Sequence, residues 1–586
     1  MNLGDRPGVV GGPSDQKHLE HRRVNMHRSI IFAIPALVVL ILALCFWQGM
    51  VANDDLGYAE IAESWIRSGQ AVPAWAGHHG GRLGLTGPLA LIFIFFGVTN
   101  WSLAVLPLIC TMATASLIAM IAYRLFGLSV AIVSGCVYAV LPLTIILATV
   151  YVPEPIATLE MTLASYLFLL AIIKENTKAN CLYFVAGLLV GMAYLTTETG
   201  SLMIVVFVIY AGLSRLVRPR LLWILVGFSV VLGSELFYYN FATGDFFYRF
   251  TLGARYAYDP VVQGANTNLP YRLLKAYPNM FIRPNLAFGL FGPLLIAAGV
   301  YGLVQLRNCS FLLIWSAVIV AFYNFMSASM SHYVALPADA RLIYPACVPI
   351  VVLAGKCITD CWQWTSRTIN TALLLLGRLL MITGLIMGLV VSLVSLYLVS
   401  STSLTVAIAR NAATVARFLD KIPSVVLMSD KRSVAAIRFY RQFNQMDYFF
   451  DFETVPDAIS THLYPADKPV FVVVNGPIVY ERETTGATYG YNLTLKDRNR
   501  LRKFMSQDVE PVFSAYLEQP FMFDLLLGYR WVRALMGARD YHFAQSVFNR
   551  EANWGSVEVF VDHAGGSALT SNTDVQVRHP LQGKTR

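Results

Sequence analysis

Residues 29–62 read SIIFAIPALVVLILALCFWQGMVANDDLGYAEIA, an apolar run that leads directly into a pair of carboxylates. The apolar part, Ser29–Met50, has the length of about 20 residues that an α-helix needs to cross a bilayer. A polar arm with five Lys or Arg residues, 1–28, precedes it. The run lacks a small-residue cleavage site and further apolar runs follow it, so we expect an uncleaved first membrane helix and not a signal peptide.

The composition of the whole chain supports this interpretation. Of 586 residues, 13% are charged and 56% are apolar, with 44 Lys and Arg against 35 Asp and Glu. A soluble domain is about a quarter charged, which excludes a single soluble enzyme, and a disordered chain would need the opposite balance. The eight cysteines lie in or beside apolar runs, without a CxxC pair, so we expect no disulfide framework.

Apolar runs of helical length recur along the first 400 residues. Besides Ser29–Met50, they fall near 101–123, 128–149, 155–173, 182–197, 200–214, 221–241, 286–306, 310–330, 341–361 and 371–399. Together they predict about eleven transmembrane helices in a polytopic α-helical protein, within a membrane domain at 29–399. A further candidate, 83–98, is about 16 residues long, a length equally typical of a re-entrant or interfacial segment.

The basic residues decide how 83–98 is interpreted, because short cytoplasmic loops carry an excess of Lys and Arg. With the N-terminus inside and 83–98 not crossing, the basic residues of the short connections all face the cytoplasm. These residues are Arg124, Lys174, Lys178, Arg215, Arg218, Arg220 and Arg307. Eleven spans then leave the arm 1–28 in the cytoplasm and place residues 400–586 outside, and the basic arm fits a bacterial inner (plasma) membrane.

The tail, 400–586, differs in character from the membrane domain. Val425–Met428 and Val470–Val474 are short runs typical of strands, and Asp430–Phe443 has the pattern of an amphipathic helix. The order strand, helix, strand predicts a small extracytoplasmic α/β domain. It contains no glycine-rich phosphate loop, so we assign it no catalysis.

Acidic residues gather on the outer side of the predicted topology. Of thirteen between residues 30 and 400, only Glu175 and Asp360 face the cytoplasm. Ionisable groups at membrane depth are costly and therefore candidates for function, and a transport path would need them near the midplane. The outer loops 51–100 and 242–285 are also longer than simple connections. The pattern favours chemistry at the outer surface, although the basic and tyrosine-rich second loop is equally typical of a phosphate or headgroup site and of a solvated surface.

The adjacent carboxylates Asp54 and Asp55 are the first catalytic candidates. Against a partly apolar wall, at least one of them would have a raised pKa and act as a base; the alternative is a water-facing helix end. His78 and His79 would complete a metal site only with a third ligand, which is not evident. We expect no metal site and no cofactor, and leave dependence on a divalent cation open.

The start of the first loop resembles the opening signature of the GT-C glycosyltransferases of family 39. In both, an apolar helix leads into an acidic pair, here Asp54-Asp55, which is followed by Tyr58-Ala59-Glu60-Ile61-Ala62. This group includes protein O-mannosyltransferases and the bacterial aminoarabinose transferases that modify lipid A. Here Asp54-Asp55 stands where the family has Asp-Glu. Later segments resemble the family in the right order: Tyr123–Gly127, Gly187–Gly200, Glu235–Phe250 and Ala340–Pro345. The resemblance covers about 50–400, and the tail matches only loosely.

The resemblance implies an inverting transfer of a sugar from a polyprenyl-phosphate donor to an acceptor hydroxyl at the outer membrane face. It makes Asp54 the base, while Asp55 and Glu154 orient the acceptor or stabilise positive charge on the sugar. Glu160 competes with Glu154 for this role. The acceptor can be a lipid, a glycan or a protein, and we expect membrane lipids but no nucleic acid as further partners.

Cations are needed for the donor phosphate, and guanidinium groups match phosphate with paired hydrogen bonds. Arg82 and Arg341 are the candidates, with Arg255 as a third. The family often has a lysine near the end of Gly187–Gly200, where this chain has Glu198 and Thr199. A lysine contact to the donor phosphate is therefore not carried over.

Two other classes of function share the many spans. A polymerase or ligase of lipid-linked glycans would rely on Arg and His pairs and not on carboxylates in the first loop. A transporter or flippase would show internal inverted repeats with broken helices in matching positions, and we see no such symmetry in the sequence.

Overall fold

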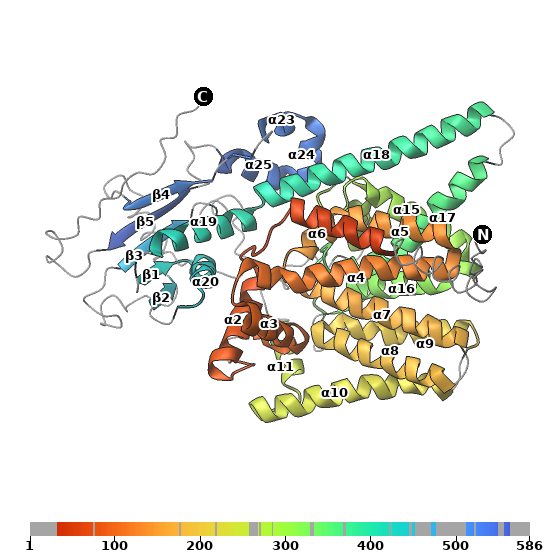
Figure 1. Cartoon of the computed structure of the whole chain (residues 1–586), viewed down its shortest axis with the longest axis horizontal. Helices are drawn as coiled ribbons and strands as arrows, with labels where there is room; N and C mark the ends of the chain where they lie inside the picture. The colour runs from red at the N-terminus through yellow and green to blue at the C-terminus, as the bar shows by residue number, and fades with distance from the viewer. Residues whose placement is uncertain are drawn as a thin grey trace, which may run out of the picture.

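A computed structural model describes most of the chain. It covers residues 32–73, 77–174, 177–216, 219–256, 268, 271–283, 285–327, 333–366, 371–420, 422, 425–444, 448–451, 470–475, 477, 511–517, 519–520, 523–548 and 556–562. The polar arm 1–28 lies outside these ranges. A bundle of helices forms one part of the molecule, and a smaller sheet with its own helices lies at one end of the bundle (Figure 1).

Seven helices of the described chain are long and apolar enough to cross a membrane. They are α4 (Asn100–Phe126), α7 (Pro153–Lys174), α8 (Thr177–Thr196), α10 (Leu222–Thr243), α16 (Leu306–Phe325), α17 (Tyr344–Ser366) and α18 (Thr371–Thr402). An eighth span is bent by 66° between α5 (Leu128–Val140) and α6 (Pro142–Ala148). The bend follows from Pro142, which lacks an N–H group and disfavours the helical conformation at Leu141.

Three shorter apolar helices account for the remaining predicted spans. They are Phe32–Cys45, α9 (Leu202–Leu213), which follows the short η2 (Glu198–Ser201), and α15 (Phe291–Val304). Every predicted run therefore contains a helix, and the chain is a multi-pass helical membrane protein. The count of eleven spans and the orientation remain predictions.

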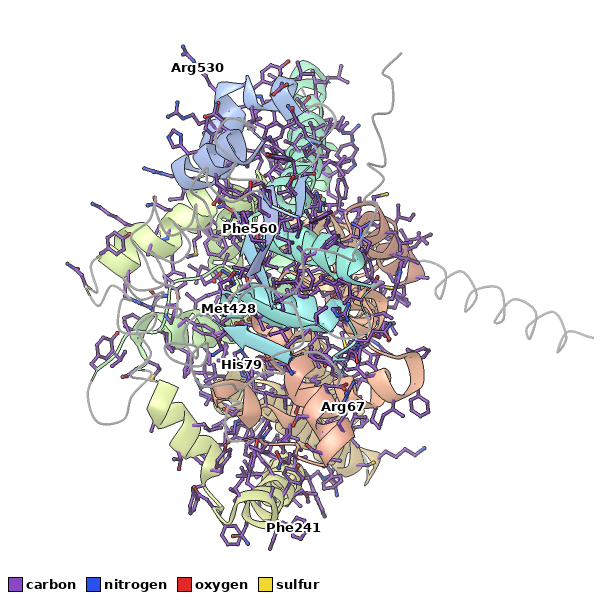
Figure 2. All side chains as sticks on the ribbon, turned by 90° about the vertical axis from the view of Figure 1, so that its left-hand side faces the viewer. Arg67, His79, Phe241, Met428, Arg530 and Phe560 are labelled. Atoms are coloured by element: carbon purple, nitrogen blue, oxygen red, sulfur yellow. The ribbon has the colours of Figure 1, made fainter. Side chains whose placement is uncertain are left out.

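The outer helices turn large apolar side chains away from the bundle, as lipid contact requires. Phe241 on α10 is 92% exposed and projects at the edge of the molecule (Figure 2). Inside the bundle, small residues let helices approach closely: a Cβ on Gly187 of α8 would lie 2.1 Å from the Ile224 carbonyl oxygen of α10. Close packing of small residues is typical of helices in lipid.

The first loop forms helices at the end of the bundle that carries the tail (Figure 1). They are α2 (Asp54–Ser68), the short η1 (Gly77–Gly81) and α3 (Leu83–Phe96). At 1.5 Å per residue, α3 is shorter than the hydrocarbon core of a bilayer is thick. The second long loop contributes α11 (Tyr248–Tyr256), η4 (Arg272–Ala276) and α14 (Tyr277–Ile282).

The tail is an α/β domain, as the sequence predicted. Within the described residues, its sheet has five strands in the order β2-β1-β3-β5-β4. They are β1 (Val426–Ser429), β2 (Tyr448–Asp451), β3 (Val470–Asn475), β4 (Phe513–Tyr516) and β5 (Ser556–Asp562). Strand β1 is parallel to β2 and β3, and β5 is antiparallel to β3 and β4. The predicted strands and helix correspond to β1, β3 and α20.

The described part of the tail also contains five helices. They are α19 (Leu404–Leu419), α20 (Lys431–Tyr440), α23 (Phe523–Leu527), α24 (Arg530–Met536) and α25 (Ala538–Val547). Asp430 caps α20 by accepting the Ser433 N–H at 2.9 Å. Helices α23, α24 and α25 lie beside the end of α18 (Figure 1), where their side chains share a core with Val391 and Leu398.

Candidate active site

Ionisable side chains from four separate segments meet at the end of the bundle that faces the tail. Arg341, just before α17, donates from Nη1 to Asp54 Oδ2 at 2.8 Å, and its Nε lies 3.1 Å from Glu154 Oε1. His79 Nε2 lies 3.6 Å from Asp54 Oδ1. Figure 2 views this end of the molecule and shows His79 near its centre. We call Asp54, His79, Glu154 and Arg341 the carboxylate–arginine cluster.

The local sequence explains why these groups share one end of the bundle. Asp54 is the first residue of α2, and Glu154 lies in the first turn of α7 behind Pro153. Carboxylates are favoured at helix N-termini, where unpaired N–H groups and the helix dipole stabilise negative charge. Arg341 lies in the turn that leads into α17, where its carbonyl accepts the Tyr344 N–H at 3.1 Å.

Asp54 is held as an anion by its neighbours. Burial would raise its pKa, but the neighbouring side chains of His79 and Arg341 lower the pKa of Asp54 well below its usual range. The Asp54 and Arg341 side chains are 24% and 29% exposed, whereas Glu154 is only 7% exposed. A substrate can therefore reach Asp54 and Arg341, while Glu154 supports Arg341 from behind.

Asp55, which the resemblance placed beside Asp54 in the site, does not join the cluster. Its Oδ2 accepts the Val51 N–H at 2.6 Å, and its Oδ1 accepts the Asn53 N–H at 2.7 Å. Burial raises the pKa of Asp55 to about 6, although these backbone N–H groups lower it. Such a pKa would suit a base, but Asp55 is 0% exposed, and a base must first reach its substrate. Through these two hydrogen bonds, Asp55 stabilises the loop before α2.

We predict that Asp55→Asn lowers stability more than it affects the intrinsic chemistry. The amide keeps the shape but turns an NH2 group toward one of two backbone donors, and leaving a buried group unsatisfied costs about 1–3 kcal/mol. Thermal unfolding in detergent would measure this loss. Asp54→Asn, at a partly exposed position, serves as the control and should unfold close to the wild type; equal Tm values for the two variants would contradict the assignment.

Arg82 belongs to a second set of charges beside the first. It donates from Nη1 to the Tyr58 hydroxyl at 2.5 Å, and its Nη2 lies 3.8 Å from Glu198 Oε2. The Tyr58 ring meets the His79 ring edge to face, with centroids 4.9 Å apart. Arg82 thus adjoins the carboxylate–arginine cluster through Tyr58, at a side chain that is 20% exposed.

The second set continues into the loop after α10. Arg249 on α11 donates from Nη2 to Glu198 Oε1 at 3.1 Å and from Nη1 to Glu235 Oε1 at 2.7 Å. It also donates to the Tyr194 carbonyl at 2.6 Å. Sequence reasoning missed this role of Arg249, although it noted both the basic loop and the acidic Glu198. The negative charge of Glu198 is paired with two arginines, Arg82 and Arg249, that lie far from it in the sequence.

Another candidate, Glu160, makes a different contact. Glu160 Oε2 accepts a hydrogen bond from the Thr196 hydroxyl at 3.0 Å, so the contact with Arg341 favours Glu154 over Glu160. Arg255 lies on α11, but its side chain is outside the described residues, and so is that of His78. The described part of the chain has no three His, Cys, Asp or Glu side chains grouped as metal ligands.

The chain was compared with known proteins. Residues 88–238 match the family model of dolichyl-phosphate-mannose-protein mannosyltransferases. The apo structure of ArnT from Cupriavidus metallidurans is 16% identical, with a TM-score of 0.50 over 79% of this chain and 95% of that chain. The apo oligosaccharyltransferase of Archaeoglobus fulgidus is 12% identical, with a TM-score of 0.54 over 91% and 88%. No curated protein sequence matches significantly.

A second structure of the archaeal oligosaccharyltransferase AglB holds an inhibitory peptide and a dolichol-phosphate. It is 12% identical, with a TM-score of 0.51 over 92% of this chain and 88% of that chain. These likenesses confirm the predicted resemblance at the level of the fold: the chain has the GT-C fold. The family match includes Glu154 and Glu198 but not Asp54 or Arg341.

Proposed function

We propose that this protein transfers a sugar from a polyprenyl-phosphate donor to an acceptor hydroxyl, at the membrane face that carries the tail. The observation that carries the proposal is the reachable Asp54 carboxylate, paired with Arg341 within a GT-C fold. The dolichol-phosphate bound to the archaeal neighbour supports a lipid phosphate as the carrier. We place this face outside the cytoplasm, in agreement with the distribution of basic residues.

The reaction needs a base and cations. Asp54 takes the proton of the acceptor hydroxyl as its oxygen attacks the anomeric carbon. The bond between that carbon and the phosphate oxygen breaks on the opposite side, and its electron pair stays with the polyprenyl phosphate. Because this leaving group is already a stable anion, no general acid is required, and fixed positive charge at the phosphate provides the stabilisation.

Arg341 contacts the base and can also supply positive charge to the donor phosphate. It holds Asp54 in the resting enzyme and is exposed enough to bind a donor phosphate. A phosphate that draws the guanidinium toward itself weakens its hold on Asp54, and the pKa of Asp54 then rises. The donor would thus make the base stronger at the moment it is needed. Glu154 keeps Arg341 within reach of both, and Arg82 is the second phosphate contact.

The same arrangement favours a reaction without a metal ion. A divalent cation would bridge carboxylates of the Asp54 and Glu154 kind, but Arg341 lies between them and contacts both. The guanidinium supplies positive charge where a cation would otherwise be placed. We therefore propose that no cofactor takes part.

A second candidate is the transfer of a preassembled glycan from a lipid carrier. The similarity to the archaeal oligosaccharyltransferase extends over 91% of the chain, which favours this alternative over a transporter. The two functions differ in the donor and not in the base.

The test is donor consumption by the purified protein in lipid nanodiscs. Polyprenyl phosphates that carry a labelled monosaccharide or a labelled oligosaccharide are offered with lipid, glycan and protein fractions of a cell envelope. We expect transfer from the monosaccharide donor, unchanged by EDTA. Transfer only from the oligosaccharide donor would favour the second candidate, loss with EDTA would overturn the metal-free mechanism, and consumption of neither donor would overturn the proposed function.

A further inference from the structure

The loop before Asp54 contains a residue in an unfavourable conformation. Ala52 has φ = +54°, in the left-handed region, and is 0% exposed. A non-glycine residue is strained there, and it persists only where its surroundings hold it. Asp55, in the first turn of α2, accepts hydrogen bonds from the neighbouring N–H groups of Val51 and Asn53.

The carbonyl of Ala52 is held from outside the membrane domain. Arg432, on α20 of the tail, donates from Nε to the Ala52 carbonyl oxygen at 3.1 Å. The two residues are 380 positions apart in the chain. Ala52 precedes Asp54 by two residues, so a rotation of its peptide group would redirect the start of α2 and the carboxylate that Arg341 contacts at 2.8 Å.

The rest of α20 is anchored along α2. Arg438 Nη1 lies 3.0 Å from Glu60 Oε1, and Arg67 of α2 donates to the Gln442 carbonyl at 3.2 Å. Apolar side chains of the two helices belong to one buried cluster, which contains Leu56 and Ala59 of α2 together with Val434, Ile437 and Phe439 of α20. These contacts fix α20 relative to α2, and they therefore also fix the position of Arg432 relative to the loop before α2.

We propose that Arg432 of the tail is a positioning residue for Asp54. It stabilises the left-handed conformation of Ala52 and so sets the direction in which α2 presents the base. The inference rests on the proposed sugar transfer and extends it, because it makes the tail, to which the sequence assigned no catalysis, a working part of the active site. Arg432 need not touch either substrate.

Arg432→Ala tests this inference. We expect kcat to fall by about 10- to 100-fold, since a misplacement of about 1 Å can cost 10²-fold, while the KM for the donor changes little. The acid limb of the pH profile should move to higher pH, because a looser contact between Asp54 and Arg341 raises the pKa of Asp54. Arg432→Lys, which can still donate to the Ala52 carbonyl, should recover part of kcat.

The matched control is Arg530→Ala, which removes an exposed arginine from the same tail at its far end (Figure 2). It should leave kcat, the pH profile and the loop unchanged. Hydrogen exchange of residues 49–54 gives a readout that does not depend on activity: exchange should be faster in Arg432→Ala than in the wild type and unchanged in Arg530→Ala. If Arg432→Ala fails to accumulate, Ala52→Gly combined with it should restore folded protein, because glycine adopts the left-handed conformation without strain.

The outcomes separate this inference from the proposed function. An inactive wild type would overturn the proposed function, and exchange in the loop would still decide whether Arg432 holds it. An active wild type with unchanged kcat and exchange in Arg432→Ala would overturn only the inference. An equal loss in Arg530→Ala, or no rescue of folding by Ala52→Gly, would also overturn it.

Discussion

Asp54→Asn is expected to lower kcat for sugar transfer by about 10²- to 10⁴-fold, the contribution typical of a positioned general base. The amide keeps the size of the side chain and still accepts a hydrogen bond from Arg341, but it cannot take the acceptor proton. Donor binding should change little, because Arg341 and Arg82 remain. Single-turnover transfer of labelled sugar in nanodiscs, with the protein matched for folded amount, measures the effect.

The control lies on the same helix. Glu63 of α2 pairs with Arg67 one turn further along, so Glu63→Gln should transfer sugar at the wild-type rate. If Asp54→Asn were as active as Glu63→Gln, Asp54 would not be the base. The role would then pass to Glu154, which shares the contact with Arg341.

Arg341→Gln is expected to reduce kcat/KM by about 10²- to 10³-fold, as the loss of one preorganised donor to a developing anion does. The variant removes a phosphate contact and leaves Asp54 and Glu154 without the cation that contacts both. Arg341→Lys should not restore activity, because one ammonium group lacks the planar fork through which Nη1 and Nε face different carboxylates.

The pH profile shows how Arg341 acts. In the wild type the pKa of Asp54 is lowered, so the base stays ionised as the pH falls and activity persists into acid. Without Arg341 the pKa of Asp54 rises, the carboxylate binds a proton at a higher pH, and the acid limb of kcat/KM moves upward. An acid limb at the same pH in both proteins would contradict the pairing, even if the rate were lower. Glu63→Gln again supplies the unshifted reference.

Local patterns were sufficient for most of the architecture. Each predicted apolar run contains a helix, because length and hydropathy alone decide whether a segment suits a bilayer. The strand, helix and strand of the tail were predictable for a similar reason, since side-chain periodicity reflects which face is buried. The bend at Pro142 was not predicted, although proline restricts the residue before it.

For the candidate site, the sequence predicted some of the residues but not all of their contacts. Asp54, Glu154 and Arg341 were predicted from a resemblance, and the structure brings them into contact. The resemblance made Asp54 the base, but the carboxylate pair by itself did not distinguish Asp54 from Asp55. Adjacent helix residues point about 100° apart, and only the path of the loop decides which one faces Arg341. The partners of Glu198 were equally hidden, since Arg82 and Arg249 lie in other loops.

The sequence by itself determined that this protein spans the membrane repeatedly and carries an α/β tail. These properties follow from composition and short-range order, which act within one segment. The tertiary structure decided that Arg341 joins Asp54 to Glu154 and that Arg432 of the tail supports the loop before the base. Contacts between residues 287 and 380 positions apart depend on how whole helices pack, and no local pattern contains that information.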